Sequence, residues 1–73
     1  MDEVAANTLR RFGENIAKIK KNKKLSYRKI AANCDIEHSD IKRYVDGKIN
    51  PTLLSIVDLA KGLDINPKDL FDF

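Results

Sequence analysis

The stretch from residue 26 to residue 47, SYRKIAANCDIEHSDIKRYVDG, constrains the fold of this chain more than any other. In its first half Ile30, Ala31 and Cys34 are spaced i, i+1 and i+4, as on one face of a helix. Its second half carries a second helical face, formed by Ile41, Tyr44 and Val45. Because Ala31 has almost no side chain, a second helix can cross closely above the first. The stretch therefore predicts a helix-turn-helix, whose second helix can lie in the major groove of DNA.

Capping residues place the ends of these two helices. Ser26 is a good N-cap for a helix that ends near Cys34, and a second helix covers about residues 38–46. Asp35 is expected to turn the chain between them in a left-handed conformation, which Asp tolerates better than most residues. Gly47 is the expected C′ residue of the second helix.

Helical patterns also fill the rest of the chain. A first helix is predicted from about Thr8 to Asn22, with a cap at Thr8 or Asn7 and an apolar stripe of Leu9, Phe12, Ile16 and Ile19. We expect residues 1–6 either to fray or to extend this helix. Thr52 is expected to cap a fourth helix, and Asn66-Pro67 to start a short fifth one. The prediction is an all-α, compact five-helix fold in a single domain of residues 1–73, with its helix-turn-helix at about residues 26–46.

Several classes of protein are disfavoured by composition. No apolar run approaches the roughly 18 residues of a membrane span, and the N-terminus lacks a secretory pattern, so we expect a cytoplasmic protein. Cys34 is the only cysteine and cannot form an internal disulfide; a core position is expected, with a redox sensor as the alternative. We find no metal-ligand spacing, no cofactor motif and no nucleophile with a placed base, so we predict that the chain is not an enzyme.

The positive charge is concentrated in one block. Residues 18–29 contain seven Lys and Arg residues and no acid, which is +7, whereas the whole chain is only +3 and the other 61 residues therefore carry −4. Such a block is typical of a surface that binds polyanions, although it can also be a solvated helix end. Lys23 and Arg28 within it are candidate phosphate contacts.

Three stretches, FGENIAKIKKNKKLS, YRKIAANCDI and YVDGKINPTLLSIVDLAKGLDINPKDLF, follow one another in the order of a known pattern. The chain resembles the lambda-repressor-like, Cro-type (Xre-like) helix-turn-helix family over residues 12–71. The resemblance implies a repressor-like transcription regulator that binds double-stranded DNA as a homodimer, with half-sites about one helical turn apart. Apolar residues at the C-terminus either add dimer surface or close the core: Leu70, Phe71 and Phe73.

The same resemblance implies roles for individual residues. Residues 38–46 become the recognition helix, and the expected contacts to base edges are His38, Ser39, Lys42 and Arg43. Expected contacts to phosphates, besides the two candidates of the basic block, are Ser26, Tyr27, Lys48 and Asn50. Arg43 is the residue suited to bidentate contact with guanine.

Some residues depart from the family pattern. Three acids, Glu37, Asp40 and Asp46, make the recognition segment less basic than usual. Val45 replaces a common Glu, so an ion pair to the first helix cannot form there, and Tyr27 replaces a common Gln. These departures motivate an alternative function, namely an antitoxin-like or adaptor module that binds a partner protein and does not read DNA.

Overall fold

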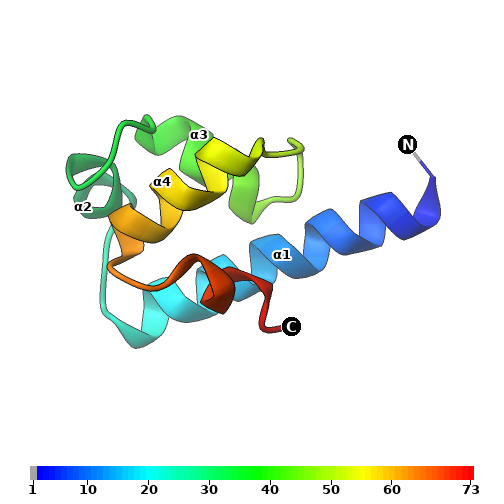
Figure 1. Cartoon of the computed structure of the whole chain (residues 1–73), viewed down its shortest axis with the longest axis horizontal. Coiled ribbons are helices and arrows are strands. Elements are labelled where there is room, and N and C mark those ends of the chain that lie inside the picture. Colours follow the sequence, from blue (N-terminus) through cyan, green and yellow to red (C-terminus); the bar gives the residue numbers. More distant parts are fainter. Residues whose placement is uncertain (1) are drawn as a thin grey trace.

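The computed structural model describes residues 2–73 as a compact helical bundle with no strand among them (Figure 1). The prediction of an all-α fold is confirmed, but the prediction of five helices is not confirmed, because the segment after Asn66 is a 3-10 helix. The described chain has four α-helices and a closing 3-10 helix: α1 (Glu3–Asn22), α2 (Tyr27–Ala32), α3 (His38–Val45), α4 (Leu53–Leu63) and η1 (Pro67–Phe71). No helix within residues 2–73 has both the length and the apolar character that crossing a bilayer requires.

The first helix is longer than its apolar stripe predicted. Asp2 is the N-cap, and its side chain accepts a hydrogen bond from the Ala5 amide at 2.7 Å, so α1 begins at Glu3 instead of Thr8. Thr8 lies inside the helix, where its hydroxyl donates to the carbonyl of Val4. Residues 3–6 therefore extend the helix, and Met1 lies outside the described residues. The extra turns project beyond the rest of the bundle (Figure 1).

The turn between α2 and α3 differs from its prediction in one respect. Ser26 caps α2 as expected, since its hydroxyl accepts from the Lys29 amide at 3.0 Å. Asp35 is not left-handed; the non-glycine residues with positive φ among residues 2–73 are Lys24 and Asp64. Instead, the amide of Asp35 donates to the Asp58 carboxylate at 3.0 Å, which ties the turn to α4.

The core forms where all five elements meet. Its buried side chains are Phe12, Ile16, Ile30, Ile41, Tyr44, Leu59, Ala60, Leu63 and Leu70. Leu70 thus closes the core, whereas Phe71 and Phe73 remain about half exposed, each with its ring near that of Phe12. Cys34 is only partly buried, and its Sγ lies 3.3 Å from the carbonyl oxygen of Ile30.

Two glycines allow helices to approach closely. A Cβ on Gly13 of α1 would lie 2.2 Å from the carbonyl oxygen of Val45 at the end of α3. A Cβ on Gly62 of α4 would lie 2.8 Å from the carbonyl oxygen of Ile30 in α2. Since these neighbours are backbone atoms that cannot rotate away, α1 and α4 can carry only glycine at these crossings. The position of α3 is therefore fixed from behind by α1.

Candidate nucleic-acid interface

Helix α3 has one buried face and one exposed face. Ile41 is fully buried and Tyr44 is 8% exposed, so both anchor the helix against the core. This confirms that Tyr44 is a core residue and not a surface contact. The four residues predicted to reach base edges are all exposed on the opposite side of α3: His38, Ser39, Lys42 and Arg43. Helix α3 begins at the upper edge of the molecule (Figure 1).

The end of α3 turns sharply into the loop that carries two predicted phosphate contacts. Gly47 has φ of 69°, and its amide donates to the Tyr44 carbonyl while the Lys48 amide donates to the Arg43 carbonyl. These two bonds form the left-handed C-terminal motif that the glycine predicted. Lys48 and Asn50 are both exposed directly after the turn.

Both cations on the exposed face of α3 form ion pairs within the same helix segment. The Nζ of Lys42 donates to both carboxylate oxygens of Asp46, at 2.8 and 2.9 Å. One turn earlier, the Arg43 guanidinium lies 3.7 Å from the Asp40 carboxylate. The hydrogen bond to Asp46 raises the pKa of Lys42 above its ordinary value, and the attraction of the Asp46 charge adds to this effect. Lys42 is therefore charged, but in the free protein its charge is shared with an acid.

The start of α2 brings a further cation to the same region. The ammonium of Lys20, from α1, lies 4.5 Å from the centre of the Tyr27 ring, which is a cation–π contact. Tyr27 is half-buried, and its ring holds the Lys20 ammonium at the start of α2. Sequence reasoning placed Lys20 in the basic block but did not single it out, because the contact with Tyr27 depends on the α1–α2 turn.

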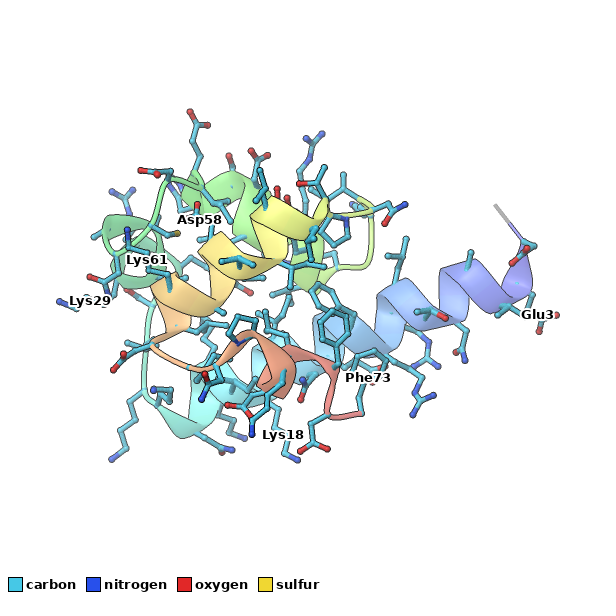
Figure 2. The ribbon with its side chains drawn as sticks, viewed as in Figure 1. Glu3, Lys18, Lys29, Asp58, Lys61 and Phe73 are labelled. Carbon is cyan, nitrogen blue, oxygen red and sulfur yellow. The ribbon has the colours of Figure 1, made fainter. Side chains whose placement is uncertain are left out.

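The remaining cations of the basic block do not form one surface. Lys23 is held at the end of α4, where its Nζ donates to the carbonyl of the C-cap residue Asp64 at 2.8 Å. Lys18 borders a hollow with Asp72 and Phe73 near the C-terminus. In Figure 2, Lys18 lies at the lower edge and Lys29 at the left end of the molecule. A helix distributes consecutive lysines around its axis, so charge that is concentrated in sequence is divided in space.

Other chemistry is limited among residues 2–73. No three side chains of the types that bind metal come together there. Burial raises the pKa of the Cys34 thiol, and the nearby carboxylates of Asp58 and Asp35 raise it further, against a backbone hydrogen bond from Ile36 that lowers it. A thiol that stays protonated is a poor nucleophile, which favours a packing role over a redox role.

Comparison with known proteins identifies the family. No family model matches the chain. The chain is similar to the control protein C.BamHI of Bacillus amyloliquefaciens, with 35% identity over 63 residues that span 85% of this chain and 78% of that protein. Its fold is similar to the crystal structure of the restriction-modification controller protein C.AhdI from Aeromonas hydrophila. That match has a TM-score of 0.81 and 32% identity, and covers 86% of this chain and 96% of the other. These relatives are regulatory proteins and not enzymes. The chain therefore belongs to the controller proteins of the Xre-like helix-turn-helix family of DNA-binding transcription regulators.

Proposed function

We propose that this chain controls transcription within a restriction-modification system, by binding a pseudo-palindromic DNA site as a homodimer. The observation that carries the proposal is the orientation of α3, which buries Ile41 and Tyr44 and exposes its polar face. The name of the relative from Aeromonas hydrophila supports the restriction-modification setting. Membership of a family of DNA-binding regulators favours this function over the antitoxin-like or adaptor module.

In this proposal the exposed face of α3 reads the major groove. An α-helix has a diameter of about 10–12 Å with its side chains, which fits the major-groove width of about 12 Å. His38 and Ser39 in the first turn meet base edges, while Lys42 and Arg43 follow one turn later. Arg43 is the residue that we assign to guanine, because its planar fork matches the O6 and N7 acceptors.

Phosphate contacts flank α3 on both sides. On one side we propose Ser26, Tyr27 and Arg28 of the α2 start, and on the other Lys48 and Asn50 of the loop. Lys20 joins the first group, since it lies over the Tyr27 ring. Lys23 can join only if its bond to the Asp64 carbonyl is released. The Ser26 hydroxyl accepts a bond within α2, so its proton remains available to a phosphate oxygen.

A second copy of the chain supplies the other half-site. Helix α4 leaves large apolar side chains in solvent, with Leu53 73%, Leu54 78% and Val57 46% exposed. Phe71 is 54% exposed, beside a shallow hollow that includes Ile56 of α4. Exposed apolar groups on one helix are typical of a protein interface. We propose that this surface of α4 and η1 pairs with its copy, and that the pairing meets the separation of about 34–36 Å that half-sites one helical turn apart require of the two α3 helices.

This function also sets the cellular setting. A regulator must work where the DNA is, so we propose the cytoplasm of a bacterial cell, with residues 1–73 acting as one DNA-binding domain.

Selection of bound duplexes from a random pool tests the proposal. The expected result is enrichment of one site with two related halves, bound by two copies of the chain. Arg43→Ala should then relax the preference at one base pair in each half by about 1–3 kcal/mol. An unchanged selected site would refute the assignment of Arg43. If no duplex is retained at low salt, the DNA-binding proposal itself fails.

A further inference from the structure

The outward face of α3 carries more negative than positive charge. Between residues 37 and 46 there are three acids and two cations, so the segment is −1 if His38 is neutral. Both cations are paired within the helix, Lys42 with Asp46 and Arg43 with Asp40. The positive charge of the α3 face that is proposed to enter the major groove is therefore neutralised by acids of the same helix segment. Sequence-independent DNA binding depends on unpaired Lys and Arg that displace counterions.

Helix stability does not explain the position of Asp46. It lies at the C-cap of α3, where the helix dipole favours cations and disfavours acids. An ion pair with the cation N-terminal to the acid, as in Lys42 and Asp46, is also the weaker of the two orders. Both side chains are exposed, at 54% and 32%, and exposed pairs contribute little to stability. The pair therefore contributes little to folding.

We propose that Asp46, assisted by Asp40, determines specificity by holding the α3 cations in intrahelical pairs that suppress binding to DNA of arbitrary sequence. The inference rests on the proposed DNA-binding function. On random DNA, the phosphates must compete with a carboxylate already bound at 2.8 Å, and that carboxylate repels them. On the selected site, base acceptors and well-placed phosphates replace the carboxylates as partners of the two cations. Each cation therefore exchanges one partner for another and does not lose one. The acids thus weaken the wrong complexes more than the right one.

The size of the effect follows from counterion release. Removing the Asp46 charge frees about one cation for a phosphate, which makes the slope of log K against log salt steeper by about 0.9. If affinity is unchanged near 1 M salt, this slope corresponds to about 8-fold tighter binding of random DNA at 0.1 M salt. The selected site should gain less, because Lys42 is already released there. The ratio of specific to random affinity should therefore fall.

The test compares Asp46→Asn and Asp40→Asn with wild type on a random duplex and on the selected duplex, at several salt concentrations. Glu14→Gln is the matched control, because it breaks an exposed i, i+4 pair with Arg10 on α1 and changes the net charge by the same amount. Glu14 borders the hollow near the C-terminus and is part neither of α3 nor of its ion pairs, so we expect it to change random binding by less than about 2-fold. Thermal melting checks that each variant is folded.

Three results have distinct meanings. A gain on random DNA for Asp46→Asn, with a smaller gain on the selected site and little change for Glu14→Gln, supports the inference. Equal gains on both duplexes, or equal gains for Asp46→Asn and Glu14→Gln, overturn it, because net charge alone would then explain binding. A wild type that selects no duplex overturns the proposed function and this inference with it.

Discussion

Gly13 offers the sharpest test of how the fold positions α3. Gly13→Ala adds one methyl group in the middle of α1, where alanine is otherwise favoured over glycine by about 1 kcal/mol. The new Cβ would lie 2.2 Å from the Val45 carbonyl oxygen and 2.6 Å from that of Tyr44. Ordinary contacts of this kind exceed about 3.4 Å, so α3 would have to move by about 1 Å or more.

The expected cost combines these two effects. Overpacking costs typically about 1–3 kcal/mol, and contact with two rigid backbone atoms puts this site at or above the upper end. After subtracting the helix propensity gain, we expect a net loss of about 2–3 kcal/mol in the free energy of unfolding, or about 10–20 °C in Tm for a domain of this size. DNA affinity should fall as well, since α3 is displaced from its support.

Urea denaturation of wild type, Gly13→Ala and Gly62→Ala measures this effect. Gly62→Ala is the graded control, because its Cβ would lie 2.8 Å from the Ile30 carbonyl oxygen and 2.9 Å from the flexible Cys34 side chain. We expect it to cost less than Gly13→Ala. If Gly13→Ala instead raises stability by the amount that helix propensity predicts, the close crossing of α1 and α3 is not as described.

Two further predictions concern the C-terminal turn and the phosphate contacts. Asn15 is 7% exposed, and its side-chain amide donates to two carbonyls of η1 at 2.9 and 3.0 Å. Asn15→Ala should therefore lower the free energy of unfolding by about 2 kcal/mol, as measured by urea denaturation. An unchanged urea midpoint would show that these hydrogen bonds do not hold η1. Lys20→Ala should weaken binding to all sequences and reduce the salt slope by about 0.9, whereas Lys23→Ala should change it less. If Lys23→Ala reduced the salt slope more than Lys20→Ala, the phosphates would contact Lys23 and not Lys20.

Sequence reasoning predicted the elements whose signals are local. The caps at Ser26 and Thr52 and the left-handed turn at Gly47 each depend on a few neighbouring residues, and the structure confirms all three. The early start of α1 was missed because Asp2 caps the helix, whereas the apolar stripe begins only at Leu9. The segment after Pro67 was predicted as a fifth helix, but its five residues form a 3-10 turn. So short a segment has too few i to i−4 bonds to favour the α form.

Features that depend on tertiary contact were not accessible from sequence. Nothing near Lys23 in sequence indicates that it bonds to the Asp64 carbonyl, 41 residues away. Gly13 carried a signal that could have been used, because a glycine inside an otherwise regular helix usually has a packing reason. Its partner, however, is the backbone at the end of α3, which only the fold identifies. The exposed face of α3 was predictable from periodicity, but its division into ion pairs was not.

The structure separates the two tasks of the recognition helix. Gly13 and Tyr44 fix the axis of α3 from behind, so the helix reaches DNA without the entropic cost of ordering. Its outward cations are paired with acids, so we expect affinity to come mainly from the proposed phosphate contacts at its flanks, where Lys20 and Lys48 take part in none of the described ion pairs. Flanking contacts alone cannot discriminate sequence. In the proposed complex, base edges replace the acids as partners of Lys42 and Arg43, so exchange of partners, and not the number of charges, contributes the sequence preference of these two cations.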